Sequence, residues 1–324
     1  MKASAGLIAA IAILHSAVAW IPKSKAVPMS LNSAVSEKVE ETVHNKVLSD
    51  DQIRIFQRDG VLLVRGLVIG EELQAAINEV DEVSRGENPF GLKSYKNLKF
   101  HHWRSSRALK DIAFNSNVPK AAAQLINLQS TGGPEGPVRL LKDAILSFAP
   151  GHTGCGWHVD DKFFWPAEDE KTGVNVWIAL THMPAKLGGG LAVSPGSHKE
   201  KFAQDAIPII RSGGTCIMEE LSPETHQKLE AMKVVYDMEP GDAIIHDRWL
   251  FHKSDDFHED VGKDVVLNRY SIRYMPEDAI AFDNKYDPVY KDPKYEGRVA
   301  TELKGYGGYY PQVYPNAIES EEEL

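Results

Sequence analysis

The 324-residue chain has only two cysteines, Cys155 and Cys216, so the small disulfide scaffolds of secreted domains are excluded, and we expect Cys155 to be an ordinary small buried residue. A membrane-spanning helix needs about 20 consecutive apolar residues, and no stretch provides them, so we expect no stable membrane anchor. Basic residues are outnumbered by acidic ones, which gives a net charge of −10 and argues against a nucleic-acid partner. The remaining composition, 43% hydrophobic and 25% charged, is that of a globular protein.

Acidic residues are also absent from the N-terminal 36 positions. Lys2, a short apolar run and the sequence Ala17-Val18-Ala19 indicate a signal peptide over residues 1–19. Residues 20–45 contain a serine- and lysine-rich part typical of a transit peptide, followed by a linker. This arrangement resembles the bipartite plastid targeting of algae with complex plastids. We therefore expect a plastid location, with secretion or the endomembrane lumen as the alternative.

The sequence Gly156-Trp157-His158-Val159-Asp160 carries the first candidate site. Side chains alternate along a strand, so His158 and Asp160 share one face and can hold a divalent metal together. A further ligand must come from elsewhere in the chain. The segment 241–254 offers His246 and His252, which lie on the same parity of an extended strand, so spacing alone does not choose between them. Two histidines and one carboxylate form the facial triad of non-haem Fe(II) oxygenases.

The motifs between and around these ligands occur in a recognisable order. Trp177-Ile178-Ala179 and Gly189-Gly190-Leu191-Ala192-Val193-Ser194-Pro195-Gly196-Ser197-His198 follow the first segment, and Gly241-Asp242, His252-Lys253-Ser254 and Arg269 come later. This pattern resembles the phytanoyl-CoA dioxygenase family of Fe(II)/2-oxoglutarate oxygenases over roughly residues 48 to 280.

The resemblance implies a site and its cofactors. His158, Asp160 and His252 would bind Fe(II), whereas His246 matches a position that is not a ligand in relatives. Arg269 would bind the distal carboxylate of the cosubstrate 2-oxoglutarate, since a guanidinium group suits a carboxylate. Trp177, Ser254 and Ile145 match other residues that line the cosubstrate pocket, and O2 is the co-reactant.

Short strands separated by glycine and proline predict a mainly β fold with flanking helices, whose core is a double-stranded β-helix, or jelly roll. We expect a dioxygenase domain over residues 46–280, divided into a helical N-terminal part with a lid (46–137) and the jelly-roll core (138–280). Residues 203–233 look like an insertion that carries a helix at 223–232. Residues 281–324 are expected to form a C-terminal tail.

One basic, aromatic-rich stretch precedes the core and contains no acidic residue. We expect it to cover the site and to receive an anionic substrate or the cosubstrate; a solvated basic surface is the alternative. Arg273 shares a strand face with Arg269 and is a further candidate, against the alternative of a surface or ion-paired arginine. The candidates for these contacts are Lys93, Lys96, Lys99, Arg104, Arg107, Lys110 and Arg273.

The predicted function is therefore oxidation of an unactivated C–H bond in a small, anionic metabolite, with release of succinate and CO2. Hydroxylation is the usual outcome in such enzymes, and desaturation or oxidative cyclisation in secondary metabolism are the known departures. The alternatives are a phytanoyl-CoA-like hydroxylase of a lipid or acyl thioester, a non-catalytic jelly-roll binding protein, and a zinc hydrolase. The sequence does not indicate the oligomeric state.

Overall fold

The computed structural model describes residues 46–84, 96–129, 136–160, 164–165, 167, 173–199, 218–281 and 302–315. The expected signal and transit segments (1–45), Lys93 and Cys216 lie outside these residues. None of the described helices is long and apolar enough to cross a membrane. Residues 46–324 form one compact unit.

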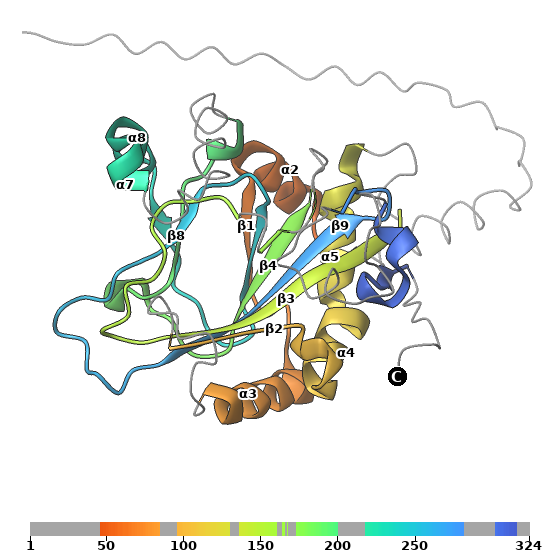
Figure 1. The fold of residues 1–324 in the computed structure, drawn as a ribbon, viewed down its shortest axis with the longest axis horizontal. Coiled ribbons are helices and arrows are strands. Elements are labelled where there is room, and N and C mark those ends of the chain that lie inside the picture. The colour runs from red at the N-terminus through yellow and green to blue at the C-terminus, as the bar shows by residue number, and fades with distance from the viewer. Residues whose placement is uncertain are drawn as a thin grey trace, which may run out of the picture. The chain divides into compact units, whose positions relative to one another are not determined.

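The helices are short and mostly precede the β core (Figure 1). They are α2 (Asp50–Asp59), α3 (Gly70–Ser84), α4 (Arg107–Asn115), α5 (Asn117–Ile126), α7 (Met218–Leu221) and α8 (Pro223–Ala231), with the 3-10 turns η1 (His102–Arg104) and η9 (Leu303–Tyr309). The expected N-terminal helices and the helix in the insertion are present. Helix α4 was not predicted, although Leu109, Ile112 and Ala113 recur at helical spacing and are buried in it.

The strands form two sheets within the described residues. The larger has the order β1-β7-β4-β9-β3-β10, with β2 also on β3, and the smaller has the order β6-β5-β8. Their bounds are β1 (Val61–Val64), β2 (Asn97–Phe100), β3 (Val138–Phe148), β4 (Val174–Ala179), β5 (Leu191–Val193), β6 (Val234–Val235), β7 (Ala243–Asp247), β8 (His252–Ser254), β9 (Leu267–Pro276) and β10 (Gln312–Tyr314). All strand pairings within the described residues are antiparallel, and the predicted jelly-roll class is confirmed.

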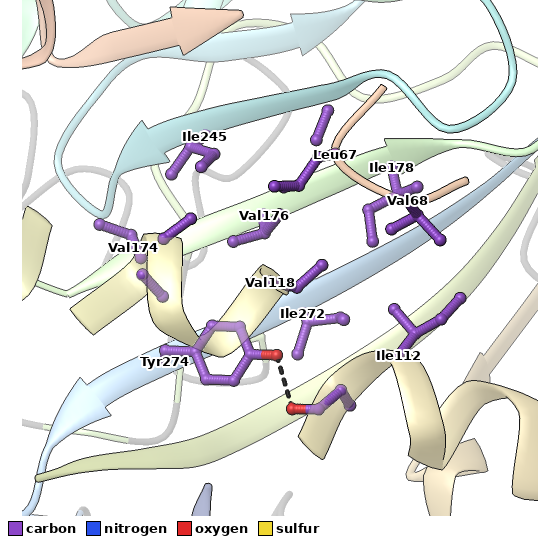
Figure 2. Close-up of a cluster of buried hydrophobic side chains, with 14 of the residues drawn as sticks. Leu67, Val68, Ile112, Val118, Val174, Val176, Ile178, Ile245, Ile272 and Tyr274 are labelled. Carbon is purple, nitrogen blue, oxygen red and sulfur yellow. Dashed lines mark hydrogen bonds between the residues drawn. The ribbon is translucent and has the colours of Figure 1, made fainter. Parts of the chain in front are cut away.

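One face of the large sheet is covered by helices. Val176, Ile272 and Tyr274 pack against Ile112 of α4 and Val118 of α5 in the main hydrophobic core (Figure 2). The Tyr274 hydroxyl donates to the Ala113 carbonyl oxygen at 2.9 Å, so its polar tip is satisfied inside the core. The candidate functional site lies on the opposite, inner face of the sheet.

Local sequence explains how the chain enters this core. Ser49 and Gln52 form a capping box at the start of α2, and Gly60 ends the helix with a left-handed φ of 68°. A Cβ at Gly60 would lie 2.4 Å from the His198 ring, so glycine is needed for both reasons. The expected C-terminal tail also contributes to the fold, because β10 pairs with β3 and Tyr310 is fully buried.

Candidate metal centre

His158 and His252 are brought together by backbone pairing. They form an isolated antiparallel bridge, in which each N–H donates to the other's carbonyl oxygen at 3.0 Å. Directly opposed residues of an antiparallel pair project to the same face, so both imidazoles point the same way. Strand β8 carries His252 as its first residue and pairs through Val193 with β5.

The three predicted ligands converge. Asp160 Oδ1 lies 4.0 Å from His158 Nε2 and 3.7 Å from His252 Nε2, and the three donor atoms all lie within 4.8 Å of one another. Within the described residues this is the one group of three side chains that could hold a metal ion. All three side chains are buried, which removes water as the competing partner.

The positions of the ring protons on His158 and His252 also suit metal binding. The Nδ1 atoms of His158 and His252 lie 2.7 and 3.0 Å from the carbonyl oxygens of Gly156 and Leu250. A carbonyl oxygen only accepts, so each Nδ1 carries the proton and each Nε2 presents its lone pair. Burial, together with the nearby His252, lowers the pKa of His158 to about 3, so its ring is neutral. Two imidazoles and one carboxylate fit the Fe(II) facial triad.

Arg273 binds the carboxylate of Asp160, one of the three predicted ligands. Its Nε donates to Asp160 Oδ2 at 2.7 Å, and its Nη1 donates to the Ser271 hydroxyl at 3.3 Å. Ser271 in turn donates to Asn175 Oδ1 at 2.7 Å. Burial opposes ionisation of Asp160, but the Arg273 charge and the hydrogen bonds outweigh it and hold the pKa of Asp160 well below its usual range. Arg273 is therefore a buried, ion-paired residue beside the metal site.

His246, the competing third ligand, lies next to the group but does not join it. Its ring centroid is 4.6 Å from that of His252, and its Nδ1 lies 2.9 Å from the Asp247 carbonyl oxygen. Its Nε2 is buried without a hydrogen-bond partner. The geometry favours His252 as the ligand.

Arg269 lies on the same inner face and is also buried. It is four residues before Arg273, a separation of about 13 Å along a strand. Its guanidinium group donates to the Gly189 carbonyl oxygen at 3.0 Å and lies 5.2 Å from the Trp177 ring centroid. Ser254 is also buried, at the end of β8. A Cβ at Gly154 would lie 2.6 Å from the Ser254 Cβ, so this glycine allows the close approach.

Ile145 does not face the site. It pairs with Tyr270 and packs in the core beneath the helices, so the expected cosubstrate contact is wrong. The cause is a register shift between Leu140 and Lys142. An extra residue in a strand exchanges the two faces beyond it, so Ala144 and Leu146 face inwards instead.

The basic stretch is not one continuous lid. Part of it is β2, in which Leu98 and Phe100 pack on the inner face. By alternation Lys96 shares their side, whereas Lys99, opposite Ile145, lies on the other side.

The later basic residues are held elsewhere. Arg104 donates to the Gly308 carbonyl oxygen at 3.1 Å. Arg107 is 93% exposed beside Asp111, and the Lys110 ammonium lies 5.7 Å from the Phe114 ring centroid. The structure therefore does not bring Arg104, Arg107 or Lys110 to the metal centre.

Sequence reasoning missed Lys142. It is 1% exposed and lies directly opposite Arg273 on β9, so it shares the inner face. The available signal was a lysine inside a mostly apolar strand. Cys155 is buried, as expected, and it is also disulfide-bonded.

The sequence profile of the phytanoyl-CoA dioxygenase (PhyH) family matches residues 56–259. The peroxisomal phytanoyl-CoA dioxygenase of Bos taurus is 24% identical over 236 residues, covering 69% of each protein, and that of Homo sapiens is 22% identical over 229 residues, covering 67% of each.

Among solved structures, the non-haem α-ketoglutarate-dependent carbocyclase SnoK from nogalamycin biosynthesis is similar, with a TM-score of 0.61 and 18% identity over 83% of this chain and 98% of SnoK. EctD from S. alaskensis, solved with 2-oxoglutarate and 5-hydroxyectoine, has a TM-score of 0.53 and 16% identity over 79% of this chain and 86% of EctD. These structural likenesses show the fold. From the family match, the chain belongs to the phytanoyl-CoA dioxygenase family, and it is an iron- and 2-oxoglutarate-dependent dioxygenase.

Proposed function

We propose that the protein oxidises an unactivated C–H bond of a small, anionic metabolite and converts 2-oxoglutarate to succinate and CO2. The observation that carries the proposal is the position of the metal centre on the inner face. Buried Arg269 lies on one side of it, and buried Arg273 and Lys142 lie beside it. Iron at this site supplies oxygen activation, which protein side chains do not provide.

The residues around the centre have distinct roles. Arg269 binds the distal carboxylate of 2-oxoglutarate, and Trp177 and Ser254 line the space between Arg269 and the metal ligands. Arg269 lies about 13 Å along β9 from Arg273. The cosubstrate therefore extends towards Arg269, and the substrate takes the side of the centre where Arg273 and Lys142 lie. The apolar walls of the site exclude water and strengthen each charged contact.

Lys142 and Arg273 support an anionic substrate. These two buried basic residues occupy opposed positions on β3 and β9, and Arg273 has five N–H donors, of which the bonds to Asp160 and Ser271 use two. A carboxylate or phosphate oxygen can accept from the others. A neutral alkyl chain offers no acceptor at this position.

A lipid or acyl thioester is the second candidate substrate. Leu98, Phe100, Leu146 and Phe148 form an apolar cluster on the inner face, against which an acyl chain could pack. The curated relatives named above carry the name of a phytanoyl-CoA dioxygenase. The reaction outcome also stays a proposal: hydroxylation is our first expectation, and desaturation or cyclisation is the alternative.

The deciding experiment loads the purified protein anaerobically with Fe(II) and then measures succinate formation from 2-oxoglutarate across a panel of metabolites. The panel contains amino-acid derivatives, other carboxylates, phosphate esters and acyl-coenzyme A thioesters. Product masses separate an added oxygen atom from the loss of two hydrogens. Stimulation by acyl thioesters alone would contradict the small-anion proposal.

We also propose that residues 1–45 direct the protein to a plastid, on the basis of their composition alone. Fusion of these residues to a fluorescent protein in an alga with a complex plastid tests this. Plastid fluorescence is expected, and cytosolic or secreted fluorescence would contradict it.

A further inference from the structure

The segments that carry the predicted ligands His158 and His252 are also connected by side chains, on the face away from the ligand side chains. Trp157 precedes His158 and Lys253 follows His252, so alternation along a strand turns both side chains away from the ligands. Both meet the same carboxylate oxygen. Glu230 Oε1 accepts from Trp157 Nε1 at 2.8 Å and from Lys253 Nζ at 2.5 Å.

Glu230 belongs to α8, in the insertion between β5 and β6. Leu229 of this helix is fully buried in a cluster with Trp157, Val159 and Phe251, so α8 packs on the outer face of the small sheet. A second ion pair, Lys233 to Asp255 at 3.0 Å, attaches the residues after α8 to the residue that follows β8. The helix is therefore fixed to the ligand segments by both apolar and charged contacts.

The backbone alone joins these segments weakly. Among the described residues, the segment of His158 joins β8 through one isolated bridge and one further backbone hydrogen bond, from the Ser254 N–H to the Cys155 carbonyl oxygen at 3.0 Å, and β8 has three residues. Two short segments held by so few backbone hydrogen bonds can twist relative to one another, which would change the separation of the two Nε2 atoms. A carboxylate bonded to a neighbour of each ligand opposes that twist.

We propose that Glu230 is a positioning residue for the metal centre, acting through Trp157 and Lys253 to fix the relative orientation of His158 and His252. This positioning role rests on the metal site of the proposed function, and it would give the insertion that contains α8 a role in metal binding. Trp157 is 1% exposed, so its indole N–H has no alternative partner in water.

The test measures metal binding without catalysis. Co(II), which has a visible spectrum sensitive to ligand geometry, is titrated into the metal-free wild type, Glu230→Gln and Glu230→Ala. The matched control is Glu224→Gln, because Glu224 lies on the same helix and pairs with Lys228 at 2.8 Å in solvent. Thermal unfolding of each metal-free protein is measured in parallel.

Glu230→Ala is expected to raise the Co(II) dissociation constant about tenfold, the low end for residues that orient ligands from outside, and to alter the Co(II) spectrum. Glu230→Gln keeps an acceptor for Trp157 and should have a smaller effect. Glu224→Gln should match the wild type. Lys253→Met should add little to the loss in Glu230→Ala, because both changes remove the same contact.

Two results separate the proposals. If Glu230→Ala lowers the melting temperature while its Co(II) affinity and spectrum match the wild type, α8 is merely structural and the positioning role is overturned. If the wild type itself binds neither Co(II) nor Fe(II), the proposed function fails together with the positioning role.

Discussion

Arg273 Nε and Asp160 Oδ2 are 2.7 Å apart, and both side chains are almost completely buried. The bond occupies one carboxylate oxygen and leaves Oδ1 directed at the two imidazoles, so the ligand is presented through a single oxygen. Breaking a buried ion pair by removing one partner costs about 3–5 kcal/mol, because the other charge stays buried and unpaired.

We predict that Arg273→Met lowers the unfolding free energy of the metal-free protein by an amount of that order. Adding Asp160→Asn should recover much of the loss, because it removes the unpaired charge. Denaturant unfolding in the presence of a chelator measures both variants. Equal stability of Arg273→Met and the wild type would show that the pair contributes nothing.

Lys96 and Lys99 offer a matched pair for the cosubstrate. Lys96 immediately precedes β2 and its N–H continues the pairing with β3, so alternation places it on the opposite side from Lys99. A charge-assisted hydrogen bond is worth roughly 1.5–3 kcal/mol, so Lys96→Gln should raise the KM for 2-oxoglutarate about tenfold or more. Lys99→Gln should leave it unchanged. The reverse pattern would mean that the side of Lys96 is misassigned.

Gly154 and Gly151 both have a positive φ, 63° and 92°, but only Gly154 approaches another residue closely. Alanine strains the backbone at either position, whereas at Gly154 its Cβ also meets Ser254. We expect both variants to lose stability and only Gly154→Ala to weaken 2-oxoglutarate binding. Calorimetric titration of the metal-loaded proteins measures this, and equal binding by the two variants would remove Ser254 from the cosubstrate pocket.

The stability of the folded protein should depend on pH through Asp247, which is not one of the predicted metal ligands. Burial raises its pKa to about 6, although the Trp249 N–H and the Arg248 charge oppose the shift. A carboxyl group with a raised folded pKa stabilises the fold at low pH, and this contribution is lost as the pH rises through about 4 to 6. At pH 7 the ionised group therefore costs up to about 3 kcal/mol.

Asp247→Asn should consequently stabilise the protein at pH 7, and its advantage over the wild type should shrink towards pH 5. Thermal unfolding across this range measures the effect, with the exposed Asp256→Asn as the control. A constant difference between pH 5 and pH 7 would show that Asp247 does not titrate there.

The sequence predicted those parts of the site that lie close together along the chain or match a family motif. His158 and Asp160 are two residues apart, and the shared face of Arg269, Ser271 and Arg273 follows from alternation in β9. The family pattern misplaced Ile145, because the bulge near Leu141 depends on how β3 pairs with β9, which is a non-local property.

The remaining features depend on tertiary contacts. Lys142 lies opposite Arg273 on a neighbouring strand that is far away in the sequence. Glu230, on an inserted helix, accepts a hydrogen bond from Trp157. Neither pairing leaves a periodic signal in either segment. The jelly-roll class was predictable because alternating strands and glycine-rich turns repeat along the whole core.

The most direct test of the central claim is oxygen-dependent succinate formation from 2-oxoglutarate by the Fe(II)-loaded protein, compared among the wild type, His158→Ala, Asp160→Ala, His252→Ala and His246→Ala. We predict that the wild type and His246→Ala bind Fe(II) and form succinate, whereas the three ligand variants form none. Loss of iron in His246→Ala with normal binding in His252→Ala would contradict the metal centre described above.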